Sequence, residues 1–188
     1  DGYARGEACC GLALSGCVDK ATLCLLGSAV RQDGRTASLT APSGKAQQGL
    51  LVSAMHDAST ADNALALEEA HGTGTSLGDP IEMNSLAQAV LMTRQDAALV
   101  VGGVKAGTGH AEQAAGIMGL LKLIIGLRAG EASANARLRV LNPHVYRAFC
   151  HVSPTCSVGL GGLAVDKFAG AVSSFGYSGT IAHTALAF

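Results

Sequence analysis

A short run of apolar residues, 98–104 (ALVVGGV), constrains the fold of this 188-residue chain more than any other feature. A continuous run of this length is typical of a parallel strand whose two faces are both covered by helices. It leads through a polar segment, residues 105–110, into residues 113–127, which have the pattern of a helix that is apolar nearly all round. We expect such a helix to be buried on all sides. The pattern predicts an α/β fold.

A second strand and helix come earlier in the chain. Residues 63–70 (NALALEEA) run into a glycine-rich stretch, 71–78, after which a helix is predicted to begin. Asp79 can cap its first turn, Pro80 fits the first helical position, and Glu82 can reach back to the N–H of the cap. Apolar residues then recur at helical spacing, which predicts one buried face: Met83, Leu86, Ala87, Val90 and Leu91.

The rest of the chain gives weaker signals. Residues 8–15 and 24–30 are predicted to be antiparallel strands, 31–43 a polar loop, and 45–56 a helix. Residues 135–162 contain Pro143 and Pro154 and are predicted to be irregular. Residues 171–175 and 181–188 flank a glycine-containing turn, which is typical of a hairpin. We therefore expect a layered α/β fold with a mixed sheet.

Composition removes several classes of function. The formal net charge is −1 and Lys and Arg are scattered, so we expect neither a nucleic acid nor a membrane surface as partner. The longest apolar stretch, 116–127, is shorter than the roughly 20 residues that span a bilayer and contains Lys122. The six cysteines have neither zinc-site spacing nor the setting of a small disulfide scaffold. These features predict a reducing, intracellular setting and a cytoplasmic protein.

The candidate chemistry lies where the two strands end. Because ligands of parallel sheets bind at the carboxyl ends of the strands, His71, His110 and Lys105 are expected to share one cleft. Neutral imidazoles can donate hydrogen bonds to an oxyanion, and a nearby ammonium disfavours their protonation. Two histidines could instead share a zinc ion, but no third ligand stands at a recognisable spacing, and no metal is expected. Residues 72–75 (GTGT) match no phosphate-binding fingerprint.

Several motifs together resemble the β-ketoacyl synthase family, most closely the ketosynthase domains of type I polyketide synthases. They occur in matching order from end to end of the chain: residues 1–7 (DGYARGE), 40–44 (TAPSG), 69–75 (EAHGTGT), 78–82 (GDPIE), 103–110 (GVKAGTGH), 114–116 (AAG), 142–144 (NPH) and 173–180 (SSFGYSGT).

The resemblance implies a thiolase-like fold, of which residues 1–188 would be the C-terminal half with the segment that precedes it. The implied reaction is a decarboxylative Claisen condensation, in which a malonyl-type extender on acyl carrier protein attacks an acyl thioester. The implied partners are the carrier protein, adjacent synthase domains and a second copy of the complete domain. No cofactor would be bound in the domain, since the carrier's phosphopantetheine holds the substrate.

The resemblance also implies roles for individual residues. His71 and His110 would stabilise the enolate, and Lys105 would hold His110, with Glu112 as its ion partner. Thr73 and Thr75 would bind the phosphopantetheine arm. The residues that would lie at the acyl pocket, its gate and the oxyanion hole are Phe175, Gly176 and Tyr177.

The nucleophile of the family has no match in this sequence. Its acylated cysteine lies in a motif of Ala-Cys-Ser type, and no such motif occurs among these residues, so the chain alone is predicted to be inactive. Gly107 and Ile181 also stand where the family usually has Asn, and Tyr177 where it usually has Phe. The alternative is therefore a non-elongating ketosynthase-fold partner or docking module.

Overall fold

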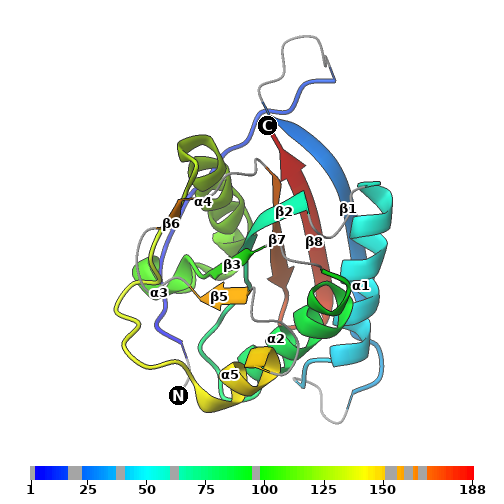
Figure 1. The fold of residues 1–188 in the computed structure, drawn as a ribbon, viewed down its shortest axis with the longest axis vertical. Coiled ribbons are helices and arrows are strands. Elements are labelled where there is room, and N and C mark those ends of the chain that lie inside the picture. The colour runs from blue at the N-terminus through cyan, green and yellow to red at the C-terminus, as the bar shows by residue number, and fades with distance from the viewer. Residues whose placement is uncertain are drawn as a thin grey trace.

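The computed structural model describes residues 3–16, 23–36, 41–59, 64–94, 98–150, 156–158, 163–164 and 169–188. Its centre is a six-stranded mixed sheet with the order β1-β8-β7-β2-β3-β5 (Figure 1). The neighbours β7, β2, β3 and β5 run parallel, whereas β8 is antiparallel to both β7 and β1. The strands of this sheet are β1 (Cys24–Gln32), β2 (Leu65–Glu69), β3 (Leu99–Gly102), β5 (Cys156–Val158), β7 (Ala169–Phe175) and β8 (Thr180–Ala187).

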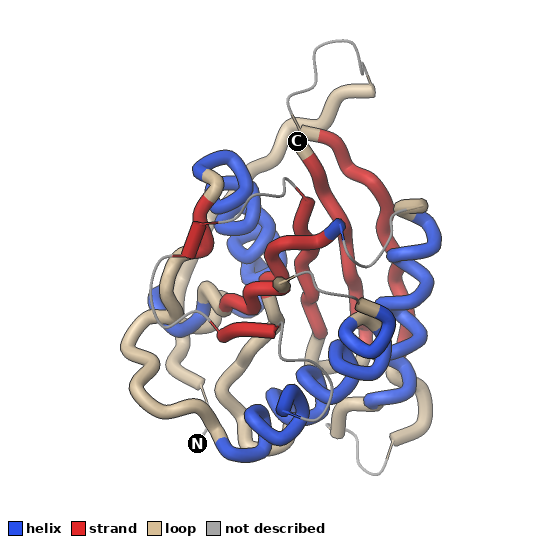
Figure 2. The backbone as a smooth tube through the Cα atoms, in the orientation of Figure 1, coloured by secondary structure: helices blue, strands red, loops and turns tan. Residues whose placement is uncertain are grey.

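Helices lie on both sides of the sheet (Figure 2). They are α1 (Gly44–Asp57), α2 (Gly78–Ala89), α3 (Lys105–Thr108), α4 (Ala115–Ala129) and α5 (Pro143–Cys150), with 3-10 turns η2 (Leu91–Thr93) and η3 (Glu112–Ala114). A small pair, β4 (Glu131–Ala132) and β6 (Leu163–Ala164), follows α4. Among the described residues, every helix is too short or too polar to span a bilayer.

Alternating side chains of the strands fill two cores. Leu99 and Val101 of β3 pack with α1, α2 and α5, whereas Val100 between them packs with α4. Residues of β7 alternate in the same way, with Ala171 on one face and Val172 on the other. This period of two is the property of a strand covered on both faces. The predicted α/β fold and the interpretation of residues 98–104 are confirmed.

Three predictions about strands and helices are wrong. Residues 8–15 form no strand, because β1 takes β8 as its antiparallel partner. Within 135–162, Pro143 begins α5, since proline is tolerated in the first turn of a helix, and Val145 and Phe149 of this helix enter the core. Finally, α4 is buried on one face only, so Ile125 is 68% exposed.

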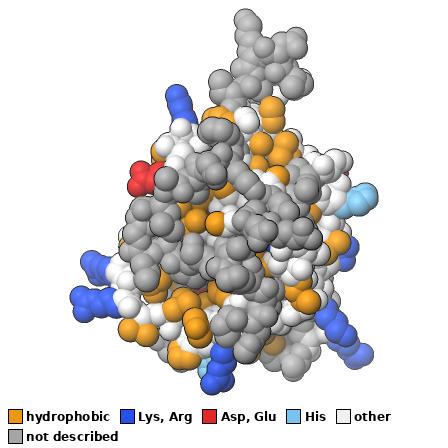
Figure 3. All heavy atoms as spheres, in the orientation of Figure 1, with side chains coloured by type: hydrophobic (Ala, Val, Ile, Leu, Met, Phe, Trp, Pro, Cys, Tyr) orange, Lys and Arg blue, Asp and Glu red, His pale blue; other side chains and the backbone are white. Residues whose placement is uncertain are grey.

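The face of the molecule drawn in Figure 3 shows no large patch of Lys and Arg among the described residues. The Lys and Arg side chains visible in this view project from the rim of the molecule at several places around it.

Candidate functional site

The carboxyl ends of the three parallel strands β7, β2 and β3 bring the predicted site residues to the same end of the sheet. His71 lies two residues after β2, and Phe175 ends β7. Lys105 and His110 follow β3 on the short helix α3 and the turn after it. The sheet order thus brings together side chains that are more than a hundred residues apart in sequence.

The two imidazole rings are neighbours. Their centroids lie 5.5 Å apart with an interplanar angle of 83°, and the ring of Phe175 lies 5.4 Å from that of His71. His71 is buried and His110 is half-buried. The expected meeting of His71 and His110 in one place is therefore what the structure contains.

Backbone amides set the tautomer of both rings. The Phe175 N–H donates to Nδ1 of His71 over 3.3 Å, and the Glu112 N–H donates to Nδ1 of His110 over 3.0 Å. In a neutral ring whose Nδ1 accepts, the proton lies on Nε2. Each imidazole therefore offers an Nε2–H as a hydrogen-bond donor.

Both rings are held neutral. Burial, with smaller contributions from the charges of Lys105 and His110, lowers the pKa of His71 to about 3. Burial and the Lys105 ammonium also lower the pKa of His110, against the opposing charge of Glu112. Neither ring is expected to carry a proton on Nδ1 near neutral pH, so both retain the donor geometry.

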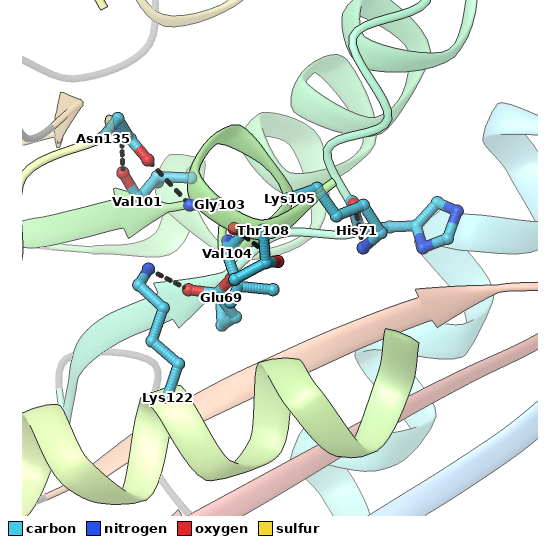
Figure 4. A network of polar contacts seen from close by, with 9 residues as sticks. All are labelled: Glu69, His71, Val101, Gly103, Val104, Lys105, Thr108, Lys122 and Asn135. Atoms are coloured by element: carbon cyan, nitrogen blue, oxygen red, sulfur yellow. Dashed lines mark hydrogen bonds and ion pairs between the residues drawn. The ribbon is translucent and has the colours of Figure 1, made fainter. Parts of the chain in front are cut away.

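Lys105 contacts a different histidine from the one expected. Its ammonium donates to the backbone carbonyl of His71 (Figure 4). The expected ion pair with Glu112 is wrong, because the Glu112 carboxylate lies 3.9 Å from Nε of Arg5 instead. Burial lowers the pKa of Lys105, and the carboxylates that oppose this are those of Glu82, Glu69 and Asp79.

Removing the Lys105 charge is expected to raise the pKa of both histidines. In Lys105→Met, the lost repulsion favours the imidazolium, so the ring of His110 should titrate at a higher pH than in the native chain. An NMR titration of the histidine rings measures this directly. Lys45→Met, at an exposed position of α1, is the matched control and should move neither ring. A His110 titration that is the same in both variants would contradict the assignment.

The loop between β2 and α2 is organised by carboxylates at the start of α2. Glu82 accepts from the His71 N–H over 2.6 Å and from the Gly72 N–H over 2.9 Å, and Asp79 accepts from the Gly74 N–H over 3.0 Å. Burial raises the pKa of Glu82 to about 7, although both N–H bonds oppose this. The predicted capping of α2 by Asp79 is wrong, since the N-cap is Leu77 and no side chain caps it. The bonds that the His71 and Gly72 N–H groups donate to Glu82 have no sequence signal that distinguishes them from a capping box.

The two threonines of the same loop lie close together. Their hydroxyl oxygens are 3.1 Å apart, and Oγ1 of Thr75 also accepts from the Gly78 N–H. Gly72 and Gly74 have φ of +48° and +80°, which other residues adopt only with strain. This backbone places Thr73 and Thr75 on one short arc of the loop beside His71.

A second network braces the turn that carries Lys105 (Figure 4). Glu69, the last residue of β2, accepts from the Val104 N–H and from the ammonium of Lys122 on α4. Asn135 accepts from the Gly103 N–H over 2.7 Å and donates to the Val101 carbonyl over 3.2 Å. The direction of the chain after β3 is therefore determined by side chains from three other segments.

The turn after β7 is tight and exposed. The Gly176 N–H donates to the Thr180 carbonyl over 2.7 Å, and Gly179 completes the turn with φ of +90°. Tyr177 at its tip is 82% exposed, so its ring projects away from the turn, whereas Phe175 packs on His71. Only one of the two aromatic residues expected at the acyl pocket therefore touches the histidines.

Among the described residues, no group of three or more His, Cys, Asp or Glu side chains could hold a metal ion. What the arrangement offers is a pair of neutral Nε2–H donors beside an ammonium. Such donors stabilise an oxyanion as it develops.

Comparison with known proteins identifies the family. Residues 23–139 match the family described as "Beta-ketoacyl synthase, C-terminal domain". The chain belongs to the β-ketoacyl synthase family. The match covers more than half of the sequence and includes the segments that carry His71, Lys105 and His110.

Relatives of this ketosynthase chain include a polyketide synthase and an erythronolide synthase. It is 36% identical over 193 residues to a component of the phenolphthiocerol/phthiocerol polyketide synthase of Mycobacterium tuberculosis, covering 99% of this chain and 9% of that protein. It is 39% identical over 160 residues to the erythronolide synthase EryA3 of Saccharopolyspora erythraea, covering 85% of this chain and 5% of that protein. The chain thus spans about a tenth or less of these relatives.

Solved ketosynthases share the fold. The ketosynthase from module 6 of the bacillaene synthase of Bacillus subtilis matches with a TM-score of 0.79 and 30% identity, covering 87% of this chain and 30% of that one. Ketosynthase twelve from the bacillaene polyketide synthase of Bacillus amyloliquefaciens matches with a TM-score of 0.79 and 30% identity, covering 87% of this chain and 29% of that one. The predicted thiolase-like fold and the likeness to the C-terminal part of a polyketide synthase ketosynthase domain are confirmed.

Proposed function

We propose that these residues supply the two-histidine half of a ketosynthase active site that catalyses decarboxylative Claisen condensation. A malonyl-type thioester loses carbon dioxide, and the electron pair of the broken C–C bond forms an enolate. The enolate carbon then attacks an acyl thioester held on a cysteine, and the thiolate leaves. The observation that carries the proposal is the adjacent pair of neutral imidazoles, each with Nδ1 occupied and Nε2–H available.

The remaining residues take supporting roles. His71 and His110 donate to the enolate oxygen, and Lys105 keeps both rings neutral while it holds the His71 backbone. Thr73 and Thr75 hydrogen-bond the phosphopantetheine arm of an acyl carrier protein. Phe175 lines the acyl pocket beside His71, and the Tyr177 N–H, in the turn that Gly176 begins, serves the thioester oxygen.

The nucleophile comes from polypeptide outside these 188 residues, which contain no Ala-Cys-Ser motif. Alone, the chain is inactive in condensation. The complete domain works as a homodimer beside adjacent synthase domains. The same missing motif supports a second candidate, a non-elongating ketosynthase-fold partner that binds carrier protein without extending the chain.

The test is the release of carbon dioxide from a malonyl carrier by the full synthase that contains these residues. His110→Ala removes one oxyanion donor, and loss of such a donor typically slows reactions about 10²-fold. His56→Ala, at an exposed position of α1, is the control and should leave the rate unchanged. An unaltered rate in His110→Ala would refute the role of the pair.

The acyl product separates the two candidates. A condensing enzyme forms a β-ketoacyl carrier whose mass exceeds that of the acyl starter by the extender minus carbon dioxide. A non-elongating partner binds acyl carrier and gives no such product.

A further inference from the structure

The N-terminal segment Tyr3–Gly6, here called the strap, pairs with the turn that carries His110. The His110 N–H donates to the Ala4 carbonyl over 2.8 Å, and the Gly6 N–H donates to the His110 carbonyl over 3.0 Å. These bonds make a parallel bridge between Arg5 and His110. In Figure 1 this blue segment passes beside α3. The strap therefore holds the backbone of His110, which lies more than a hundred residues later in the sequence.

Two glycines allow the strap and the turn to approach this closely. A Cβ on Gly6 would lie 2.4 Å from the Thr108 carbonyl oxygen, which no real contact allows. A Cβ on Gly109 would lie 3.0 Å from the Arg5 carbonyl oxygen, and Gly109 has φ of +78°. The two backbones are in direct contact, so a displacement of the strap would move the His110 turn.

The strap also touches the imidazole itself. The ring of Tyr3 lies 4.7 Å from that of His110, centroid to centroid, with an interplanar angle of 57°. Since the ring of His71 is the other neighbour of His110, the plane of the His110 imidazole is defined by two ring contacts.

Glu112 contacts the strap through its side chain and His110 through its backbone N–H. Its backbone is left-handed, with φ of +47°, a conformation that costs free energy for a residue with a side chain. That conformation accompanies the N–H bond to Nδ1 of His110. Its carboxylate accepts from the Tyr3 hydroxyl over 3.5 Å and lies 3.9 Å from Nε of Arg5. The strap therefore holds both the side chain and, through it, the strained backbone of Glu112.

We propose that the strap is a positioning device for His110, in which Tyr3 fixes the plane of the imidazole and, with Arg5, holds Glu112 where its N–H binds Nδ1. Tyr3 is a positioning residue, since it acts through His110. The consequence for catalysis rests on the proposed function, whereas the consequence for the tautomer of His110 does not.

The first test is nitrogen NMR of the histidine rings in the chain. In the native chain the His110 signals should report a proton on Nε2 alone. Tyr3→Leu removes the ring contact and should give a mixture of both tautomers. Tyr3→Phe keeps the ring and leaves Arg5 to hold the Glu112 carboxylate, so the Nε2–H tautomer should remain predominant. Gly6→Ala displaces the strap by another route and should give the same mixture as Tyr3→Leu. His183 is buried and far from the strap in sequence. Unchanged His183 signals in the same spectra would show that the fold is intact.

The second test is the rate of carbon dioxide release by the full synthase. We expect a fall of about tenfold in kcat for Tyr3→Leu, recovery of most of it in Tyr3→Phe, and no change in Tyr146→Leu, an exposed tyrosine of α5. A single Nε2–H tautomer in both Tyr3→Leu and Gly6→Ala would overturn the proposal. A native synthase that releases no carbon dioxide, together with mixed tautomers in these variants, would overturn the proposed function and leave the strap's role standing.

Discussion

Replacing Glu69 with leucine is expected to lower the free energy of unfolding by about 3–5 kcal/mol, the range found when one member of a buried ion pair is removed. The side chains of Glu69 and Lys122 are only 4% and 24% exposed. Without the carboxylate, the partly buried Lys122 ammonium loses its ion partner, and the Val104 N–H loses its acceptor. Urea unfolding of the chain, followed by circular dichroism, measures the loss.

Two further variants show whether the unpaired charge is the cause. Adding Lys122→Met to Glu69→Leu replaces the ion pair by an apolar pair and should restore a large part of the stability. Glu131→Leu, at an exposed position in β4, is the matched control and should change stability by no more than about 0.5 kcal/mol. If the double variant were as unstable as Glu69→Leu alone, the loss would come from the hydrogen bond to Val104.

The parts of the fold that could be predicted are those in which local pattern and packing agree. Residues 98–104 are apolar at every position because β3 is covered on both faces, and that property can be seen in the sequence alone. Residues 8–15 show a similar pattern, but a strand also needs a hydrogen-bonding partner, and β1 pairs with β8 instead. Helix α4 is apolar on nearly every side yet leaves Ile125 exposed, because composition does not tell which face meets a neighbour.

The site could be predicted only as far as position along the chain determines it. His71 and His110 each follow a strand, and the carboxyl ends of parallel strands meet, so their proximity follows from the topology. The hydrogen bonds of Glu82 to the loop before it could not be predicted from a spacing that equally suits a capping box. The contact of Tyr3 with His110 joins residues 107 positions apart, and no local pattern specifies it.

Glu68 is a third buried carboxyl, beside Glu69 and Glu82, and it bonds to a different set of groups. It accepts from the Ser173 hydroxyl over 3.1 Å, and that hydroxyl lies 2.9 Å from Nδ1 of His183. Among the described residues, nothing bonds to Oε2 of Glu68, to Nε2 of His183 or to Oε1 of Gln47. Gln47 and Glu68 line the same small cavity between α1, α2 and the sheet. A protonated Oε2 would supply a donor in a cavity that otherwise contains an unpaired acceptor.

The electrostatics favour that protonated form. Burial raises the pKa of Glu68 well above its ordinary 4.5, and the charges of Glu82 and Glu69 raise it further, against the Ser173 bond. Because the folded state keeps a proton that the unfolded state releases above pH 4.5, rising pH favours unfolding. The linkage amounts to about 1.4 kcal/mol for each pH unit between the unfolded and folded pKa values.

Glu68→Gln is therefore expected to stabilise the chain increasingly as the pH rises. Glutamine is uncharged in both states, so it removes this penalty, while its amide can still accept from Ser173 and donate toward Gln47. Burial lowers the pKa of His183 to about 4, which costs stability as the pH falls below 6.5 in both proteins. Nδ1 of this ring lies 3.8 Å from Oε1 of Glu68. Urea unfolding of both proteins at pH 5 and pH 7.5 measures the gain in the free energy of unfolding. We expect a small gain at pH 5 and a gain larger by up to about 3 kcal/mol at pH 7.5. Glu131→Gln, at an exposed position of β4, is the control. It should change the free energy of unfolding by the same amount at both pH values. A Glu68→Gln difference that did not change with pH would mean that this carboxyl is ionised in the folded chain, and the donor to the cavity would have to be sought elsewhere.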